Sequence, residues 1–257
     1  MLSSLKRLPV MTLVASMAGL ASTAVPARHV PRRSLCAASL KDAVDLATLR
    51  KEYSKQGLNE EDMSDEPMQT FDTWIQEAIN AKCIEPNAMC VSTCQDNTPS
   101  ARYVLLKAHD KRGFVWFTNY ESRKGEDLAA NPAAAITFWW GDLERSVRIE
   151  GKVEKVSEQE SDDYFNKRPR GAQLGAWSSN QSRPIRSREE LAAQEQSIIA
   201  HFKDMPKVTR PPHWGGYRLV PTRIEFWKGR ESRLHDRLVY ERASGEEQWT
   251  RPKRLQP

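Results

Sequence analysis

The sequence lacks the short motifs that mark several common classes of enzyme. It contains no glycine-rich nucleotide loop, no His-Glu-x-x-His zinc motif and no Gly-x-Ser-x-Gly nucleophile elbow. Its four cysteines, Cys36, Cys83, Cys90 and Cys94, do not have the paired spacing of a zinc site or of a small disulfide-linked domain. We therefore expect no bound metal, and the unpaired cysteines favour a reducing compartment.

Acidic residues are absent from the first 41 positions, which hold six of the 39 Lys and Arg residues. The rest of the chain has 33 basic residues against 34 acidic ones, so the net charge of +5 comes from the N-terminal segment alone. A body without excess positive charge offers no broad basic patch, and we therefore expect no nucleic-acid partner.

An N-terminal segment without acids but with Arg and Ser is typical of an organelle transit peptide. Arg28, Arg32 and Arg33 extend its charge beyond the apolar residues 8–25, which favours a transit peptide over a secretory signal. Ser and Thr interrupt the apolar stretch, so we expect no membrane anchor. The sequence thus predicts a cleaved or disordered targeting leader over residues 1–44, with a mitochondrial rather than a plastid or cytosolic destination.

No internal repeat or long linker divides residues 45–257, so we expect one domain there. Apolar residues at helical spacing predict helices over 46–53 and 67–82, and Ser122, Ser157 and Ser187 are placed to cap three more. Alternating patterns predict strands at 88–94, 101–107, 114–118, 134–140 and 146–156, and from residues 216, 224 and 234. Antiparallel strands with a few helices between them predict a mainly β (α+β) fold, a small barrel with peripheral helices.

Three basic residues alternate in the stretch Arg233-Leu234-His235-Asp236-Arg237. As a strand, the stretch would place Arg233, His235 and Arg237 on one face, where their charges repel one another. An anion or an electron-rich ring against that face would relieve the repulsion, so the stretch predicts a ligand-facing surface. A solvated edge strand is the alternative that these five residues leave open.

Two further groups of residues have the character of anion sites. Arg123 and Lys124 lie in the first turn of a predicted helix, whose unpaired amides and positive dipole end favour a phosphate. Two solvated cations on a surface turn are the alternative.

Tyr164 and Arg168 are four residues apart on a predicted helix and would share one face. Lys107 would lie on the strand of Arg102 with the opposite side-chain direction, so that one strand could serve two anions. An exposed helix with a half-buried Tyr is the alternative for the first pair.

From about residue 45 to the C-terminus, the chain resembles the pyridoxine (pyridoxamine) 5'-phosphate oxidases. The resemblance rests on six stretches at the spacing of that family: 102–107, 117–125, 164–169, 214–217, 224–227 and 233–237. It implies an FMN-binding split β-barrel and a homodimer with flavin at the subunit interface. It also implies oxidation of pyridoxine 5'-phosphate and pyridoxamine 5'-phosphate to pyridoxal 5'-phosphate, with oxygen reduced to hydrogen peroxide.

The resemblance also implies a role for individual residues. The residues implied to bind FMN are Arg102, Tyr103, Val104, Leu105, Phe117, Thr118, Arg123, Lys124, Gln181, Ser182, Trp227 and Arg237. The residues implied to bind the substrate are Arg50, Tyr53, Lys107, Tyr164, Arg168, Arg233, Leu234 and His235. Arg233 and His235 would hold the substrate ring against the flavin and are the candidate catalytic residues. The segment of Arg50 and Tyr53 would act as a lid.

Two positions depart from the family pattern. Ser146 stands where a Gln usually faces the flavin, and Ala172 stands where a Ser commonly donates a hydrogen bond to the substrate phosphate. Two other functions therefore remain open: a split-barrel flavin reductase with another substrate, and a catalytically silent pyridoxal-phosphate carrier.

Overall fold

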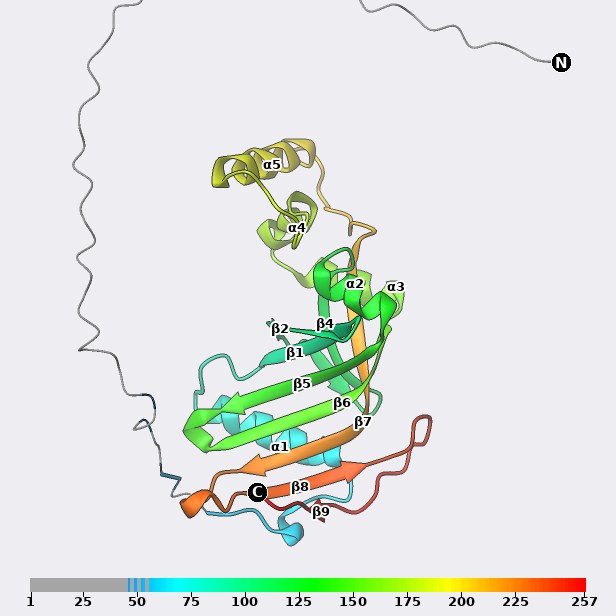
Figure 1. Ribbon diagram of the computed structural model, residues 1–257. Helices are drawn as coiled ribbons and strands as arrows, with labels where there is room; N and C mark the ends of the chain where they lie inside the picture. Colours follow the sequence, from blue (N-terminus) through cyan, green and yellow to red (C-terminus); the bar gives the residue numbers. More distant parts are fainter. Residues whose placement is uncertain (1–45, 47–48, 50–51, 54–55) are drawn as a thin grey trace, which may run out of the picture. The chain divides into compact units, whose positions relative to one another are not determined.

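One antiparallel sheet, organised around the long strand β7, forms the centre of the fold (Figure 1). The computed structural model describes residues 46, 49, 52–53 and 56–257, and within them the sheet has nine strands. These are β1 (Ala88–Gln95), β2 (Thr98–Leu105), β3 (Ala108–Asp110), β4 (Gly113–Asn119), β5 (Ala133–Trp140), β6 (Arg145–Lys155), β7 (Trp214–Lys228), β8 (Asp236–Glu241) and β9 (Lys253–Arg254). The prediction of a mainly β fold is confirmed.

The strand order is β2-β1-β5-β6-β7-β4-β3; β8 joins the sheet by pairing with β7, and β9 pairs with β8. One edge of β7 pairs with β6 along most of its length. The other edge pairs first with β4, over 214–219, and then with β8, over 223–228. The sequence predicted separate strands from Gly216 and Ile224, which is wrong, because β7 continues through Pro221. A register shift at Glu150/Gly151 of β6 accommodates that proline.

Five α-helices occur in the described part of the chain, and the last two lie beyond the end of the sheet (Figure 1). They are α1 (Pro67–Asn80), α2 (Arg123–Ala130), α3 (Glu158–Lys167), α4 (Arg170–Ser178) and α5 (Arg188–His201). Short 3-10 turns occupy Glu60–Asp62, Gly141–Leu143 and Glu231–Arg233. A helix over 46–53 was also predicted, but Leu49, Glu52 and Tyr53 are not helical, and Arg50 lies outside the described residues.

The main hydrophobic core lies between α1 and the sheet. Phe71 of α1 is fully buried and its ring centroid lies 5.2 Å from that of Phe138 on β5. Trp74, one turn later, meets Phe226 of β7 edge-on at 5.1 Å. A smaller core joins Phe165 of α3 to Trp214 at the start of β7. Because Trp214 belongs to this second core, the packing of α3 fixes the end of β7 nearest to it.

Serine caps begin three of the helices, as the sequence predicted. Ser122, Ser157 and Ser187 each accept a hydrogen bond from an amide in the first turn of α2, α3 and α5. At α5, Glu190 also accepts a hydrogen bond from the Arg186 amide at 3.2 Å. The sequence pattern did not predict α4, whose two glycines have low helix propensity.

None of the helices in the described part of the chain has both the length and the apolar character needed to cross a membrane.

We predict that Gly151→Ala destabilises the protein by about 1–3 kcal/mol. A Cβ at Gly151 would collide with the backbone carbonyl of Val220 on the neighbouring strand, where neither backbone can move without breaking the ladder. Urea unfolding followed by tryptophan fluorescence measures the change. Gly171→Ala is the matched control, because a Cβ there meets nothing within 4 Å and α4 gains helix propensity. Equal stability of the two variants would contradict the prediction.

Candidate active site

A cavity of about 560 Å³ is lined by residues of β2, β4, β7, α2, α3 and α4 and of the segments between them. Five of its described lining residues are basic and none is acidic. The basic residues are Arg102, Lys107, Lys124, Lys167 and Arg168. The two predicted anion sites are therefore brought together in one cavity, whose excess of basic over acidic lining residues suits anionic ligands.

Lys124 is the most buried of these cations, with 8% of its surface exposed. Its Nζ donates to Gln181 Oε1 at 2.6 Å, to Thr118 Oγ1 at 3.1 Å and to Ser122 Oγ at 3.2 Å, and all three acceptors are neutral. Burial, together with the charge of Arg102, lowers the pKa of Lys124 to about 8. A buried ammonium with neutral partners is costly, and an anion in the cavity would relieve that cost.

Arg102 is held rigidly at the edge of the same cavity. Its NH1 donates to Thr93 Oγ1 at 2.7 Å, and its NH2 donates to Ser100 Oγ at 2.7 Å and faces Asp127 Oδ2 at 3.5 Å. Sequence reasoning missed Asp127, because its position one turn after Arg123 suggests an ion pair within the helix rather than across to β2.

Arg123 and Ser182 are not among the residues that line the cavity. Arg123 points to solvent from the first turn of α2, and Ser182 has a positive φ of 72° beside the lining residue Gln181. The backbone of α2 thus directs one of its two N-terminal cations into the cavity.

Arg168 lies over the ring of Trp214, with its guanidinium carbon 4.6 Å from the ring centroid. Phe117 stacks on Tyr164 at 4.0 Å and on Trp214 at 5.6 Å, so these aromatic rings form one wall. Within the described residues, NH1 of Arg168 is buried without a hydrogen-bond partner. That nitrogen is a donor whose hydrogen-bonding capacity is unused within the described residues.

Two details of the second anion site were predicted wrongly. Helix α3 ends at Lys167, so Tyr164 and Arg168 do not share a helix face, although both line the cavity. Strand β2 ends at Leu105, so Lys107 lies beyond it and reaches the same cavity as Arg102. The sequence did not predict that Lys167 and Trp214 line the cavity.

A second group of predicted site residues meets at the far end of β7. Trp227 lies 4.8 Å from the ring of His235 and 5.6 Å from that of Tyr53, and the Tyr53 and His235 rings are 5.5 Å apart. Arg237 on β8 is the direct cross-strand neighbour of Trp227. Ser146 of β6 is the neighbour of Trp227 on the other side. Its hydroxyl donates a hydrogen bond to the backbone carbonyl of Phe138 on β5, at 2.9 Å.

The prediction that Arg233, His235 and Arg237 share one strand face is wrong. Strand β8 begins at Asp236, and Ser232 and Arg233 have left-handed backbone, with φ of 54° and 64°. Such a conformation cannot continue a strand. Leu234 is exposed in the same turn, and its predicted substrate contact stays a prediction.

His235 is held in one orientation by the turn that precedes it. Its Nδ1 accepts a hydrogen bond from the Arg230 amide at 3.1 Å, which leaves Nε2 to carry the proton of the neutral ring. Burial of the ring and, to a smaller extent, the positive charge of Arg233 lower the pKa of His235. The ring is therefore neutral at pH 7 and offers one N–H donor.

The two groups lie at opposite ends of β7. Phe117 of the cationic cavity pairs with Gly216, and Trp227 stands eleven residues further along the strand. At about 3.3 Å per residue, that is on the order of 35 Å along β7. The residues around the cavity and those around Trp227 form separate sets.

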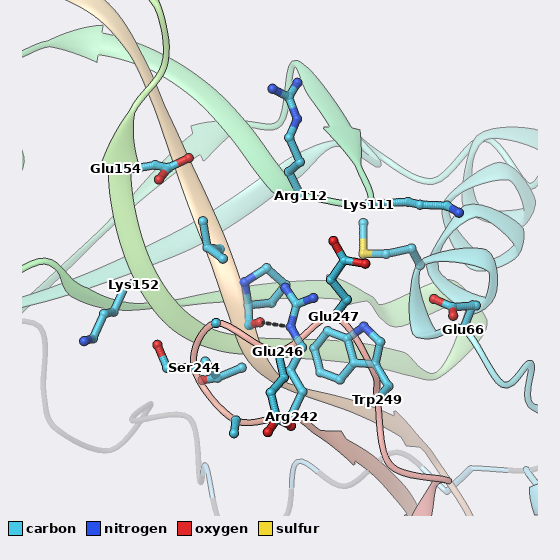
Figure 2. A pocket seen from close by; sticks show the side chains of 16 residues that line it. Glu66, Lys111, Arg112, Lys152, Glu154, Arg242, Ser244, Glu246, Glu247 and Trp249 are labelled. Carbon is cyan, nitrogen blue, oxygen red and sulfur yellow. Dashed lines mark hydrogen bonds between the residues drawn. The ribbon is translucent and has the colours of Figure 1, made fainter.

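A further cavity of about 450 Å³ lies beside the β8–β9 loop (Figure 2). None of the predicted site residues lines it, and its four basic residues face four carboxylates. Arg242 is occupied there, since it stacks on Trp249 at 4.5 Å and donates Nε to the Pro221 carbonyl at 2.7 Å. Its balanced charge separates this cavity from the cationic one.

Comparison with known proteins places the chain in a family. Residues 75–201 match the family described as pyridoxamine 5'-phosphate oxidase, and residues 214–257 match the pyridoxine 5'-phosphate oxidase C-terminal dimerisation region. The chain belongs to the pyridoxamine 5'-phosphate oxidase family. The second match supports a homodimer.

Relatives named pyridoxine/pyridoxamine 5'-phosphate oxidase resemble most of the chain. One from Burkholderia lata is 58% identical over 198 residues, which are 77% of this chain and 92% of the relative. One from Paraburkholderia phytofirmans is 55% identical over 205 residues, 79% of this chain and 95% of the relative.

Solved structures share the fold. The structure of PhzG from Burkholderia lata 383 in complex with tetrahydrophenazine-1-carboxylic acid has a TM-score of 0.73 and 29% identity, covering 80% of this chain and all of that one. A pyridoxamine 5'-phosphate oxidase-related, FMN-binding protein from Nostoc punctiforme has a TM-score of 0.60 and 15% identity, covering 76% of this chain and all of the other. The second likeness concerns the fold alone.

The predicted mitochondrial destination is wrong. Relatives that are 54–58% identical to the chain are bacterial proteins, and bacteria have no mitochondria. A transit peptide is identified by composition alone, and an acid-free, Arg-containing segment can have that composition without being an address. The predicted leader, residues 1–44, lies outside the described residues.

We predict that the affinity of the cationic cavity for a phosphate monoester, with FMN as the probe, falls as the pH rises from 7 to 9. Lys124 attracts the phosphate only while its ammonium group is protonated. Because the pKa of Lys124 is about 8, this group loses its charge between pH 7 and 9. The limiting slope is about tenfold per pH unit for one proton. Quenching of flavin fluorescence measures the dissociation constant. Lys124→Arg is the control, because a guanidinium stays charged; a slope that persists in this variant would refute the assignment.

Proposed function

We propose that the protein is an FMN-dependent oxidase that converts pyridoxine 5'-phosphate and pyridoxamine 5'-phosphate to pyridoxal 5'-phosphate. The observation that carries the proposal is the cavity lined by five basic and no acidic described residues, large enough for two phosphate groups. Membership of the family and the close relatives of that name support the same reaction.

The flavin phosphate is assigned to the part of the cavity around Lys124 and Arg102. Ser122 caps α2 there, so the amides of its first turn add donors and the positive end of a helix dipole. A single terminal phosphate fits this arrangement, which favours FMN over a dinucleotide. The residues present therefore suit the group, and Thr118 and Gln181 supply neutral polar contacts beside it.

The substrate phosphate is assigned to Arg168, Tyr164 and Lys107 of the same cavity. The buried NH1 of Arg168, which has no protein acceptor among the described residues, is the donor that such a phosphate would satisfy. Lys167 adds a further positive charge at the cavity wall. A substrate without a phosphate would leave these cations uncompensated.

Bound FMN supplies the electron acceptor for the two-electron oxidation. The substrate loses a hydride equivalent from its 4' carbon and a proton from the attached hydroxyl or amino group, and oxygen finally takes the two electrons and two protons as hydrogen peroxide. The amine substrate also takes up water and releases ammonia. The protein binds and orients: neutral His235 offers Nε2–H to the substrate ring, and Arg233 adds a positive charge beside it.

The site is completed by a second copy of the chain. Trp227, His235 and Arg237 lie on the order of 35 Å along β7 from the phosphate cavity, so one flavin cannot reach both groups in one chain. The C-terminal region that carries these three residues matches the family's dimerisation region. A homodimer would bring the cavity of one subunit to the Trp227 group of the other.

A peroxide assay with the FMN-loaded protein tests the proposal. We expect turnover of both phosphate esters, and at least tenfold lower kcat/KM for pyridoxine and pyridoxamine without phosphate. Tetrahydrophenazine-1-carboxylic acid, the tricyclic compound bound in the PhzG structure, distinguishes this function from a PhzG-like one, since it carries a carboxylate and no phosphate. Failure to bind FMN, or turnover of the tricyclic acid without turnover of either ester, would overturn the proposal.

We predict that Arg233→Leu and His235→Leu each lower kcat/KM by about tenfold or more while FMN stays bound. Both residues lie in the turn before β8, away from the phosphate cavity, so flavin content reports separately on cofactor binding. Glu231→Gln is the control, because Glu231 is exposed in the same turn. Unchanged kinetics in both Leu variants would show that the turn has only a structural role.

We predict that Ala172→Ser lowers the KM for the phosphate esters by roughly tenfold. Ala172 lines the cavity with Arg168, and a hydroxyl donor to phosphate contributes about 1.5–3 kcal/mol in good geometry. Steady-state kinetics with the ester and with phosphate-free pyridoxine separate the effect from a general one. An equal gain for both substrates, or none for the ester, would show that the hydroxyl does not reach the phosphate.

A further inference from the structure

The outer face of the sheet carries two rows of side chains near the end of β7. Trp139, Ser146, Trp227 and Arg237 are successive cross-strand neighbours on β5, β6, β7 and β8. In the next row, Arg148 of β6 is the direct neighbour of Glu225 on β7. A cavity of about 240 Å³ lies over this face, and both Trp227 and Glu225 line it.

Glu225 is the buried centre of the second row. Its side chain is 6% exposed and both of its oxygens accept hydrogen bonds. Oε1 accepts from Arg237 Nε at 2.8 Å, and Oε2 accepts from Arg148 NH2 at 2.9 Å and from Arg223 NH1 at 3.4 Å. One carboxylate thus holds three guanidinium groups, and one of them belongs to a predicted flavin ligand.

The electrostatics show that Glu225 is charged. Burial alone would raise the pKa of its carboxyl, but the hydrogen bond from Arg237 and the charges of Arg148, Arg237 and Arg223 lower it below the ordinary value. Arg237 is fixed at a second point, because its NH1 donates to the Gln256 carbonyl at 3.0 Å. The guanidinium is therefore held in place before any ligand arrives.

We propose that Glu225 is a positioning residue, an inference that rests on the proposed function. Glu225 holds Arg237 in place for the flavin and offsets the positive charge of Arg237. It acts through Arg237 and does not contact the substrate. Orientation before binding removes the cost of ordering a long side chain, so the affinity for FMN should depend on Glu225. Its negative charge should also make the bound flavin harder to reduce.

Glu225→Gln tests the proposal in two measurements on the full chain. We expect the dissociation constant of FMN for the apoprotein to rise about tenfold or more, because a charge-assisted bond to Arg237 is lost. We expect the reduction potential of the bound flavin to become more positive. Glu150→Gln is the matched control: Glu150 belongs to the same network through Arg148 and Arg223 but does not bond to Arg237, and its variant should match wild type in both measurements.

A double variant separates positioning from general stabilisation of the sheet. If Glu225 acts through Arg237, Glu225→Gln has no further effect on FMN affinity once Arg237→Gln is present. Equal losses with and without Arg237 would overturn the proposal. Thermal unfolding of each apoprotein verifies that the variants fold.

Glu225→Asp is the substitute test variant if the Gln variant does not fold. The shorter side chain keeps the charge and withdraws from Arg237, so FMN affinity should fall while the potential changes less. Wild-type affinity in the Asp variant would overturn the positioning role. If the wild-type protein itself does not bind FMN, the proposed function is wrong. This outcome differs from a failure of the Glu225 proposal, in which the wild-type protein binds FMN.

Discussion

The length of β7 is the constraint on which the rest of the structure depends. Its 15 residues pair with β4 at one end and with β8 at the other, so a single strand connects both groups of predicted site residues. Trp214 at its start forms part of the cationic cavity, and Trp227 near its end faces His235 and Tyr53. A continuous strand cannot fold back to bring its own ends together. A site that needs both ends must therefore be formed between two chains.

The cationic cavity has a cost in stability that its ligands would remove. The pKa of Lys124 is about 8 in the folded chain, below the ordinary value of 10.5, so the unfolded chain binds this proton more tightly. The folded apoprotein is therefore destabilised below pH 8, and its stability rises as the pH increases from about 8 to 10.5. A bound phosphate would reverse this effect by favouring the charged form. Ligand binding and folding stability are thus linked through one buried ammonium.

Local signals in the sequence predicted the parts of the fold that local physics determines. The caps Ser122 and Ser157 were predictable because a hydroxyl at an N-cap bonds to an amide only three residues away. The left-handed backbone at Ser232 and Arg233 was not, because neither residue type favours it and the surrounding turn imposes it. Asp127 was missed because its partner Arg102 lies 25 residues away on another element.

The cations of the two site groups differ in what holds them. Arg102 and Arg237 are each tied to a buried carboxylate, Asp127 and Glu225, and so their positions are fixed while their charges are largely offset. Lys124 has neutral partners, and Arg168 has a buried nitrogen without an acceptor among the described residues. Lys124 and Arg168 therefore keep more charge and donor capacity for an anion than the two paired arginines do, because an ion pair already formed within the protein has less charge to offer. The paired arginines contribute geometry instead, since a guanidinium that is already oriented loses little freedom when a ligand binds.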